Sequence, residues 1–125
     1  MNKFLIKAKK KGDGGEWIVG LPWLKHYDGQ MFIRCFPNND DEDCVYVVDQ
    51  NTFSRQTGQK DKYGFEIWEH DIVELFDEDG LFEVVWNDET SRFEIIGNDL
   101  IFDFDNYWGY QCEVLGNRFD MPWAL

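Results

Sequence analysis

The order of apolar and polar residues along the chain predicts many short β-strands and no long helix. Apolar and polar side chains alternate in short runs, such as KFLIKAK at residues 3–9, and this period of two is typical of strands. No segment keeps the period of about 3.6 residues that an amphipathic helix requires. The predicted strands are residues 3–9, 16–21, 30–36, 44–49, 71–76, 81–86, 92–96, 99–104 and 111–115.

Turn residues separate the predicted strands at short intervals. The run GDGG at residues 12–15 predicts a loop, and the Asp-Gly pair that ends DEDG at residues 77–80 suits the positive φ of a hairpin turn. Residues 65–69 and 106–110 are each long enough for one helical turn. Many short strands with regular turn signals favour a mainly β protein of barrel-like or sandwich architecture.

The length and the cysteine content agree with a small intracellular protein. A chain of 125 residues can bury a core as one compact domain or as two small subdomains, without a disulfide or a metal. The three cysteines have no metal-binding spacing, and His26 and His70 are the only histidines, so no metal or other cofactor is expected. We expect Cys35, Cys44 and Cys112 to be reduced thiols that pack as small apolar groups.

The first residues predict no export signal. In MNKFLIKAKKK the basic residues follow a short apolar run, which is the reverse of the order in a secretion signal. No later segment is long enough to span a membrane. We therefore expect a protein of the bacterial cytoplasm that has no membrane partner.

The formal net charge of −13 is unevenly distributed along the sequence. Residues 1–11 contain five lysines and no acid, so the remaining residues carry −18. A body of this sign repels phosphate groups, so nucleic acid is not expected as a partner, whereas a basic protein would be attracted. The lysines at residues 9–11 could contact phosphate, but a solvated strand end explains them more simply. The six tryptophans are interpreted as core and contact residues rather than as platforms for bases.

The stretch QTGQKDKYGFEIWEHDIV at residues 56–73 is the most specific motif in the chain. It closely resembles the signature of YopX-like proteins, which are small proteins encoded by phages and prophages. The resemblance extends to EWIVG at residues 16–20 and to CEVLGNRFDMPWAL at residues 112–125. The motif residues are Gln56, Thr57, Gly58, Lys60, Asp61, Gly64, Glu66, Ile67, Trp68, Asp71, Ile72 and Val73.

The family resemblance implies a mostly β fold of two small barrel-like parts and self-association, and it brings no established enzymatic activity. Together with the strand pattern it predicts a mainly β chain of two small barrel-like (SH3-like) subdomains, with short antiparallel strands and one or two helical turns. We expect an N-terminal β subdomain at residues 1–55, a turn-rich connector at 56–70, and a C-terminal β-meander with an apolar tail at 71–125.

The polar residues of the motif are interpreted as turn-forming residues. Gly58 and Gly64 can adopt positive φ, which a tight turn often requires. Asp61 and Asp71 can accept hydrogen bonds from backbone N–H groups of their turns. No catalytic residue is predicted within the motif.

His70 departs from the family signature, which has glycine at this position. Glycine there predicts a backbone with positive φ, and histidine is among the residues that tolerate this conformation. We therefore interpret His70 as a local cap rather than as a general base. A base would also need a nucleophile or an orienting carboxylate, which Glu69 or Asp71 could supply only if the fold aimed it at the ring.

Acidic clusters give the remaining candidate sites. DDED at residues 40–43 and DED at 77–79 could hold calcium, but they lack EF-hand spacing, so solvated loops are expected. Asp103 and Asp105 flank Phe104 and would share one strand face. They could act as paired carboxylates, although the wet face of an edge strand is the preferred interpretation.

The leading functional prediction is a non-enzymatic YopX-like protein that forms homo-oligomers and binds a host or phage protein. The apolar tail is the predicted interface, because such side chains are rarely left in water, but it could also pack on its own subunit. Two alternatives remain open: an acidic nucleic-acid mimic that antagonises a basic DNA-binding protein, and a nucleic-acid-binding SH3-like module that uses the lysine-rich start. The candidate interface residues are Met121, Pro122, Trp123 and Leu125.

Overall fold

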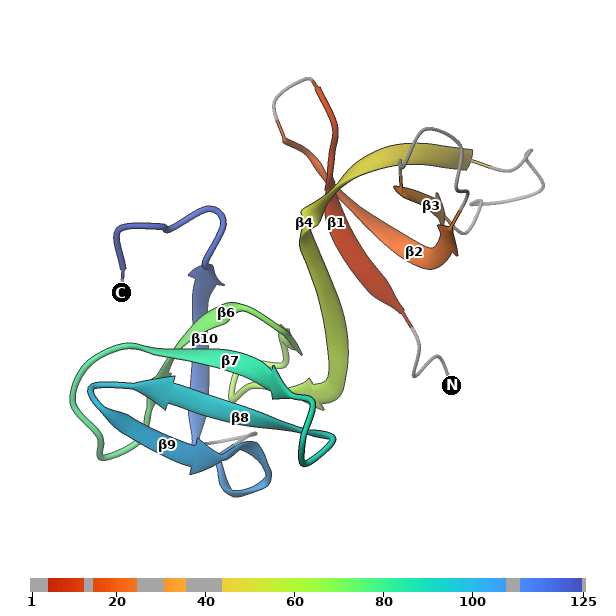
Figure 1. Cartoon of the computed structure of the whole chain (residues 1–125). Coiled ribbons are helices and arrows are strands. Elements are labelled where there is room, and N and C mark those ends of the chain that lie inside the picture. The colour runs from red at the N-terminus through yellow and green to blue at the C-terminus, as the bar shows by residue number, and fades with distance from the viewer. Residues whose placement is uncertain (1–4, 13–14, 25–30, 36–43, 108–110, 125) are drawn as a thin grey trace. The chain divides into compact units, whose positions relative to one another are not determined.

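The computed structural model describes residues 5–12, 15–24, 31–35, 44–107 and 111–124 (Figure 1). The chain divides into two compact units, Met1–Arg55 and Gln56–Leu125, which we name unit 1 and unit 2. Each unit has its own cluster of buried apolar side chains.

The prediction of a mainly β protein is confirmed. In the described residues the regular structure consists of ten strands and one short 3₁₀ helix, η1 (Phe104–Asn106). The strands are β1 (Ile6–Lys10), β2 (Trp17–Leu24), β3 (Met31–Cys35), β4 (Cys44–Lys60), β5 (Glu66–Trp68), β6 (Asp71–Leu75), β7 (Phe82–Asn87), β8 (Arg92–Gly97), β9 (Leu100–Asp103) and β10 (Cys112–Asn117).

The strands form two antiparallel sheets (Figure 1). In the first sheet the order is β1-β2-β3-β4-β5, and β1 also pairs with β4. The second sheet has the order β10-β6-β7-β8-β9, so that β6 to β9 form a meander and β10 returns to pair with β6. The predicted antiparallel strands are confirmed, but β4 is 17 residues long and continues through Gly58, where the sequence predicts a turn. Within the described residues neither sheet closes into a barrel, so the barrel-like, SH3-like detail is not confirmed.

Alternation along β1 explains the core of unit 1. Ile6 and Ala8 are buried, while Lys7 and Lys9 point to the opposite face and are partly exposed. Ala8 lies opposite Ile18 of β2, which is also buried, so the two strands contribute one apolar face. The core of unit 1 contains Ile6, Ala8, Ile18, Ile33 and Val48.

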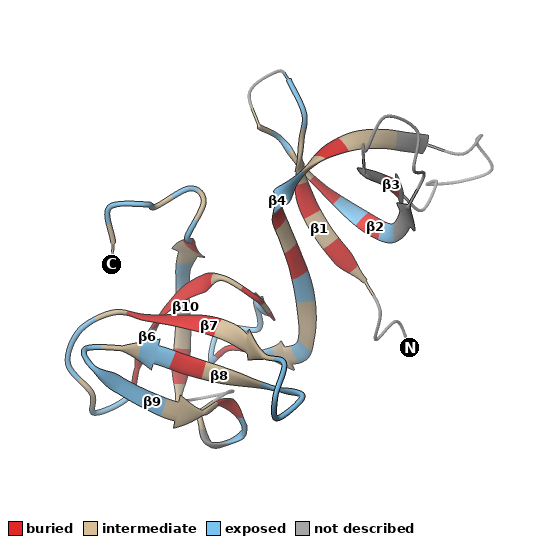
Figure 2. Ribbon diagram, viewed as in Figure 1, coloured by how far each residue is buried: buried red, intermediate tan, exposed pale blue. Residues whose placement is uncertain are grey.

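The core of unit 2 lies on one face of the second sheet. Phe82 and Val84 of β7 are fully buried in it, and Figure 2 shows the buried stretches of β6 and β7. The rings of Phe82 and Phe102 meet edge to face, with their centroids 5.8 Å apart. The core of unit 2 contains Ile67, Val73, Leu75, Phe82, Val84, Ile95, Phe104 and Cys112.

The predicted helical turn at residues 65–69 is wrong, because this segment contains β5. The backbones of Glu66 and Trp68 pair with those of Lys60 and Gln56 in β4. This pairing places Ile67 on the buried face and Glu66 in solvent, an alternation that a strand provides. Local propensity allowed a helical turn, but the tertiary pairing with β4 decides the conformation.

The predicted helical turn at residues 106–110 is displaced toward the N-terminus. Helix η1 begins at Phe104, because the Asp103 carboxylate accepts the Asp105 N–H at 3.2 Å and caps it. Residues 108–110 lie outside the described residues. In unit 1, the strand predicted at residues 16–21 is longer, since β2 continues through Pro22 to Leu24 and pairs there with β3.

A Gly97→Ala substitution is expected to destabilise unit 2 strongly. A Cβ at Gly97 would lie 2.4 Å from the Leu81 carbonyl oxygen and 2.8 Å from a ring carbon of Phe82, so backbone must move. We expect the free energy of unfolding, measured by urea denaturation, to fall by about 3 kcal/mol.

The matched control is Gly58→Ala, at a position with φ of 85° and open space around the missing Cβ. Backbone strain alone should then cost about 1 kcal/mol. Equal losses in the two variants would contradict the close approach at Gly97.

Candidate functional site

The family motif spans the end of β4, all of β5 and the start of β6, within unit 2. The Thr57 hydroxyl donates a hydrogen bond of 2.7 Å to the carbonyl of Ile67 and so ties β4 to β5. Gly58 has φ of 85°, a backbone conformation that glycine adopts without strain. The Gln56 amide donates to the Glu66 carboxylate across the same pair of strands.

Asp61 connects the motif to the last strand of the chain. Its Oδ1 accepts the N–H groups of Tyr63 and Phe65, each at 2.9 Å, and thereby closes the turn between β4 and β5. Its Oδ2 accepts the Val114 N–H of β10 at 2.9 Å. Gly64, with φ of 88°, allows the chain to reverse within this turn. Both oxygens of this buried carboxylate therefore accept hydrogen bonds from backbone N–H groups.

Asp71 makes a second connection to the end of β10. Its Oδ2 accepts the Trp68 N–H at 2.8 Å, which shapes the turn between β5 and β6. Its Oδ1 accepts the side-chain amide of Asn117 at 3.1 Å, in a buried pair. The side-chain Oδ1 of Asn117 in turn accepts the Phe119 N–H at 3.0 Å. This chain of hydrogen bonds orients the residues that follow β10.

The remaining motif residues are divided between the interior and solvent. Ile67 and Val73 lie in the core of unit 2. Ile72, their neighbour on β6, is also fully buried but points to the opposite face of the sheet. Trp68 is partly buried and Lys60 is exposed.

His70 has φ of 73°, in agreement with the positive φ predicted from the glycine of the family signature. Its N–H donates to the carbonyl of Val84 in β7 at 2.6 Å. Its carbonyl accepts the Arg118 N–H at 2.8 Å. The backbone of this one turn residue therefore contacts both β7 and the segment after β10.

The side chain of His70 lies between two carboxylates. Its Nδ1 is 3.0 Å from Oε2 of Glu83, and its Nε2 is 3.5 Å from Oε2 of Glu69. The Arg118 guanidinium is 3.4 Å from the same Glu83 oxygen, and the ring of Phe119 meets the imidazole edge to face. We name Glu69, His70, Glu83 and Arg118 the His70 cluster.

Sequence reasoning named Glu69 as a possible partner of His70 and missed Glu83 and Arg118. The only signal for Glu83 was an acid between two strongly apolar residues, Phe82 and Val84, in a predicted strand. Among the described residues, the imidazole contacts two carboxylates and an aromatic ring. This arrangement supports the structural interpretation of His70.

The ionisation of Glu83 is coupled to the His70 cluster. Burial by itself raises the pKa of Glu83, but the hydrogen bond from His70 and the positive charge of Arg118 outweigh burial and hold the pKa below 4.5. The carboxylate therefore stabilises the folded state most where it is ionised, which is above the pKa of the unfolded chain.

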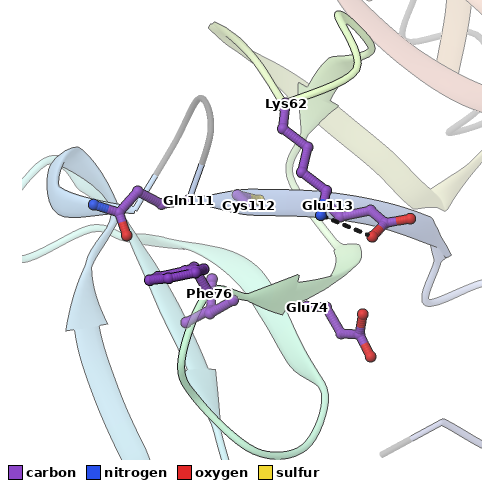
Figure 3. Close-up of a pocket in the computed structure, with 7 residues that line it drawn as sticks. Lys62, Glu74, Phe76, Gln111, Cys112 and Glu113 are labelled. Atoms are coloured by element: carbon purple, nitrogen blue, oxygen red, sulfur yellow. Dashed lines mark ion pairs between the residues drawn. The ribbon is translucent and has the colours of Figure 1, made fainter.

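A small hollow lies beside the paired ends of β6 and β10 (Figure 3). Its volume of about 70 Å³ is well below that of a typical small-molecule site. Lys62 and Glu113 form an ion pair of 3.5 Å at its rim. Burial and the nearby acids raise the pKa of Cys112 to about 12, so its thiol is protonated and a poor nucleophile. The lining residues are Lys62, Glu74, Leu75, Phe76, Gln111, Cys112 and Glu113.

The acidic candidates take separate positions. Asp103 and Asp105 do not share a strand face, so that prediction is wrong: Asp103 ends β9, whereas Asp105 lies in η1. Asp103 instead lies 3.5 Å from the Arg92 guanidinium. Residues 40–43 lie outside the described residues, and Asp77 belongs to a turn with φ of 67°. Within the described ranges, no three His, Cys, Asp or Glu side chains are arranged to hold a metal ion.

The apolar tail partly folds back on unit 2. The Met121 N–H donates to carbonyls of the preceding turn, and its sulfur would lie 2.4 Å from a Cβ at Gly116. Pro122 and Trp123 are exposed. Leu125 lies outside the described residues. The tail thus has one residue packed on its own unit and two in solvent.

These features define a small, mainly β protein in which the motif residues build turns and tie strands together. The family model described as YopX protein matches residues 10–125. Because the match covers most of the chain, the protein belongs to the YopX family. No curated protein matches the chain. Within the residues that the structure describes, no helix is long and apolar enough to cross a membrane.

An Asp61→Asn substitution is expected to destabilise unit 2 by about 2 kcal/mol, because the amide nitrogen would face the Val114 N–H and leave one buried donor unpaired. Urea denaturation measures the loss. The control is Asp88→Asn, since Asp88 is exposed and accepts a hydrogen bond from the Trp86 indole. A loss at Asp61 no larger than that at Asp88 would contradict the connecting role.

A Glu83→Gln substitution is expected to change how stability depends on pH. The folded-state pKa of Glu83 lies below its ordinary value of 4.5, so its stabilising contribution is present above that value and is lost as pH falls through the folded-state pKa. The difference in unfolding free energy between wild type and variant should be largest near neutral pH and should shrink in acid. A constant difference between pH 7 and acid, in thermal or urea unfolding, would contradict the coupling.

Proposed function

We propose that this YopX-family protein is a non-enzymatic binding module that associates with itself and with a host or phage protein through unit 2. On this proposal it is phage- or prophage-encoded, works in the bacterial cytoplasm and uses no cofactor. The observation that carries the proposal is that unit 2 leaves large apolar side chains in water although it has a core of its own.

One exposed apolar area lies at the end of the β8–β9 hairpin. Ile96 of β8 is opposite Ile101 of β9, and the exposed fraction of Ile101 is 66%. Leu100, opposite Gly97, is 40% exposed at the same end of the hairpin but lies on its other face. We name Ile96 and Ile101 the β8–β9 patch, and Figure 2 shows exposed segments on both strands.

The backbone of β9 adds a second means of association. Among the described strands, β9 stands at the end of the order of the second sheet. A strand in this position has one row of N–H and C=O groups directed away from its neighbour, and such groups can pair with a strand of another chain. Apolar side chains beside that edge favour pairing with protein rather than with water.

The tail supplies a second exposed apolar area. Trp123 is 74% exposed, although Met121, two residues earlier, is held against its own unit. A tryptophan that is anchored nearby and projects into solvent resembles the aromatic anchors that dominate binding energy at protein interfaces. We therefore assign Pro122 and Trp123 to the proposed interface and Met121 to its support.

The charge of unit 2 favours a basic partner as a second candidate. Unit 2 contains four Lys or Arg against seventeen Asp or Glu, which accounts for the whole net charge of −13. An acidic surface of this kind could mimic nucleic acid and occupy a basic DNA-binding protein. The two candidates respond oppositely to salt, because salt screens repulsion between two acidic copies but also screens attraction to a basic partner.

Two variants test the interface. Ile101→Lys and Trp123→Ala are each expected to weaken self-association by about tenfold or more, measured as molar mass by light scattering across a concentration series. The control is Phe76→Ser, because Phe76 is 68% exposed but lies outside both areas.

A wild-type protein that stays monomeric and captures no host protein would contradict the proposal. Dissociation by Phe76→Ser alone would contradict the assigned surface. If capture of a basic protein is lost at moderate salt while self-association is absent, the second candidate replaces the first.

A further inference from the structure

The two units differ sharply in charge. Unit 1 contains eight Lys or Arg and eight Asp or Glu, so its formal charge is zero, whereas unit 2 carries −13. The expectation that nucleic acid is excluded was based on the charge of the whole chain. That argument applies to unit 2 and does not apply to the surface of unit 1.

One face of unit 1 gathers lysines around an aromatic ring. Lys7 and Lys9 leave β1 on the face opposite the buried Ile6 and Ala8. The Nζ of Lys7 lies 4.6 Å from the centroid of the Trp17 ring, and the Nζ of Lys9 lies 5.5 Å from it. We name Lys7, Lys9 and Trp17 the Lys–Trp face.

Local backbone geometry holds Lys9 in this position. Gly15 has φ of 67°, and a Cβ there would lie 3.3 Å from Cδ of Lys9. The side chain of Lys9 therefore occupies the space that a side chain at residue 15 would need. The Lys9 N–H donates to the Thr52 hydroxyl of β4 at 2.7 Å. Asp49, the β4 residue opposite Lys9, accepts the Asn51 N–H on its carboxylate at 3.0 Å.

Exposed apolar groups extend the Lys–Trp face along β2. Lys10 alternates to the other face of β1, where its Nζ lies 5.2 Å from the centroid of the Tyr46 ring, and Lys11 is exposed. On β2, Val19 and Leu21 follow Trp17 on the same face and are both exposed. The result is a partly aromatic surface that carries two lysines and one nearby acid, Asp49, on a unit without net charge.

We propose that the Lys–Trp face binds single-stranded nucleic acid. Ammonium groups over an indole ring can move to phosphate oxygens, which frees the ring to stack on a base. Duplex DNA keeps its base faces covered, and an acidic peptide offers no flat π-surface to Trp17, so the combination of lysines and aromatic ring favours a single strand. This binding is separate from the proposed interface in unit 2.

The test is fluorescence anisotropy of a labelled oligo-dT about 20 nucleotides long, titrated with the full chain in low salt and again at higher salt. We expect binding that weakens with salt. Replacing both lysines, in a Lys7→Gln/Lys9→Gln variant, should reduce affinity at least tenfold. It should also reduce the magnitude of the slope of log binding constant against log salt concentration by about 1.4.

The matched control is Lys60→Gln/Lys62→Gln, which changes charge equally at two exposed lysines of unit 2 and should keep the affinity. A Lys7→Arg/Lys9→Arg variant should also bind, which separates loss of charge from loss of folding. No anisotropy change in low salt would overturn the proposal. So would equal loss in both glutamine variants, or displacement of the oligonucleotide by polyglutamate as efficiently as by unlabelled oligo-dT.

Discussion

The carboxylate of Asp61 is the contact on which the arrangement of unit 2 depends. Apolar packing draws strands together but does not fix their relative positions, because the hydrophobic effect is non-directional. A buried carboxylate is stable only when hydrogen-bond donors surround it, so its position is strictly defined. Asp61 receives N–H groups from its own turn and from Val114 of β10, which joins the first residues of unit 2 to the last strand. Asp71 with Asn117, and His70 with Arg118, repeat this connection along the same edge.

The sequence was sufficient for those features that depend on local chemistry. Alternation predicted β1 and β7, and the glycine of the family signature predicted the positive φ of His70. Prediction from the sequence failed where contacts with a distant segment determine the conformation. β5 is a strand because β4 pairs with it. Glu83, the partner of His70, and Val114, the partner of Asp61, reach the motif only because the second sheet brings β7 and β10 to it. The hydrogen bonds of the motif aspartates to their own turns could be predicted, whereas their bonds to β10 could not.

Hydrogen bonds and ion pairs within unit 2 account for much of the polar density of the motif. Its carboxylates bond to backbone and side-chain donors, its histidine contacts other charged side chains, and the nearby thiol of Cys112 is protonated and buried. The groups that we propose for binding lie outside the motif. Unit 2 combines strong negative charge with the β8–β9 patch and Trp123, and unit 1 carries the Lys–Trp face. The two proposals therefore assign a different kind of partner to each unit.

Residue-resolved amide hydrogen exchange tests the central claim most directly. If Asp61 holds the turn against β10, the amides of Tyr63, Phe65 and Val114 should exchange slowly and at similar rates, as parts of one cooperative unit. Fast exchange at Tyr63 and Phe65 beside a protected Val114 would show that the turn opens independently, and would contradict the account.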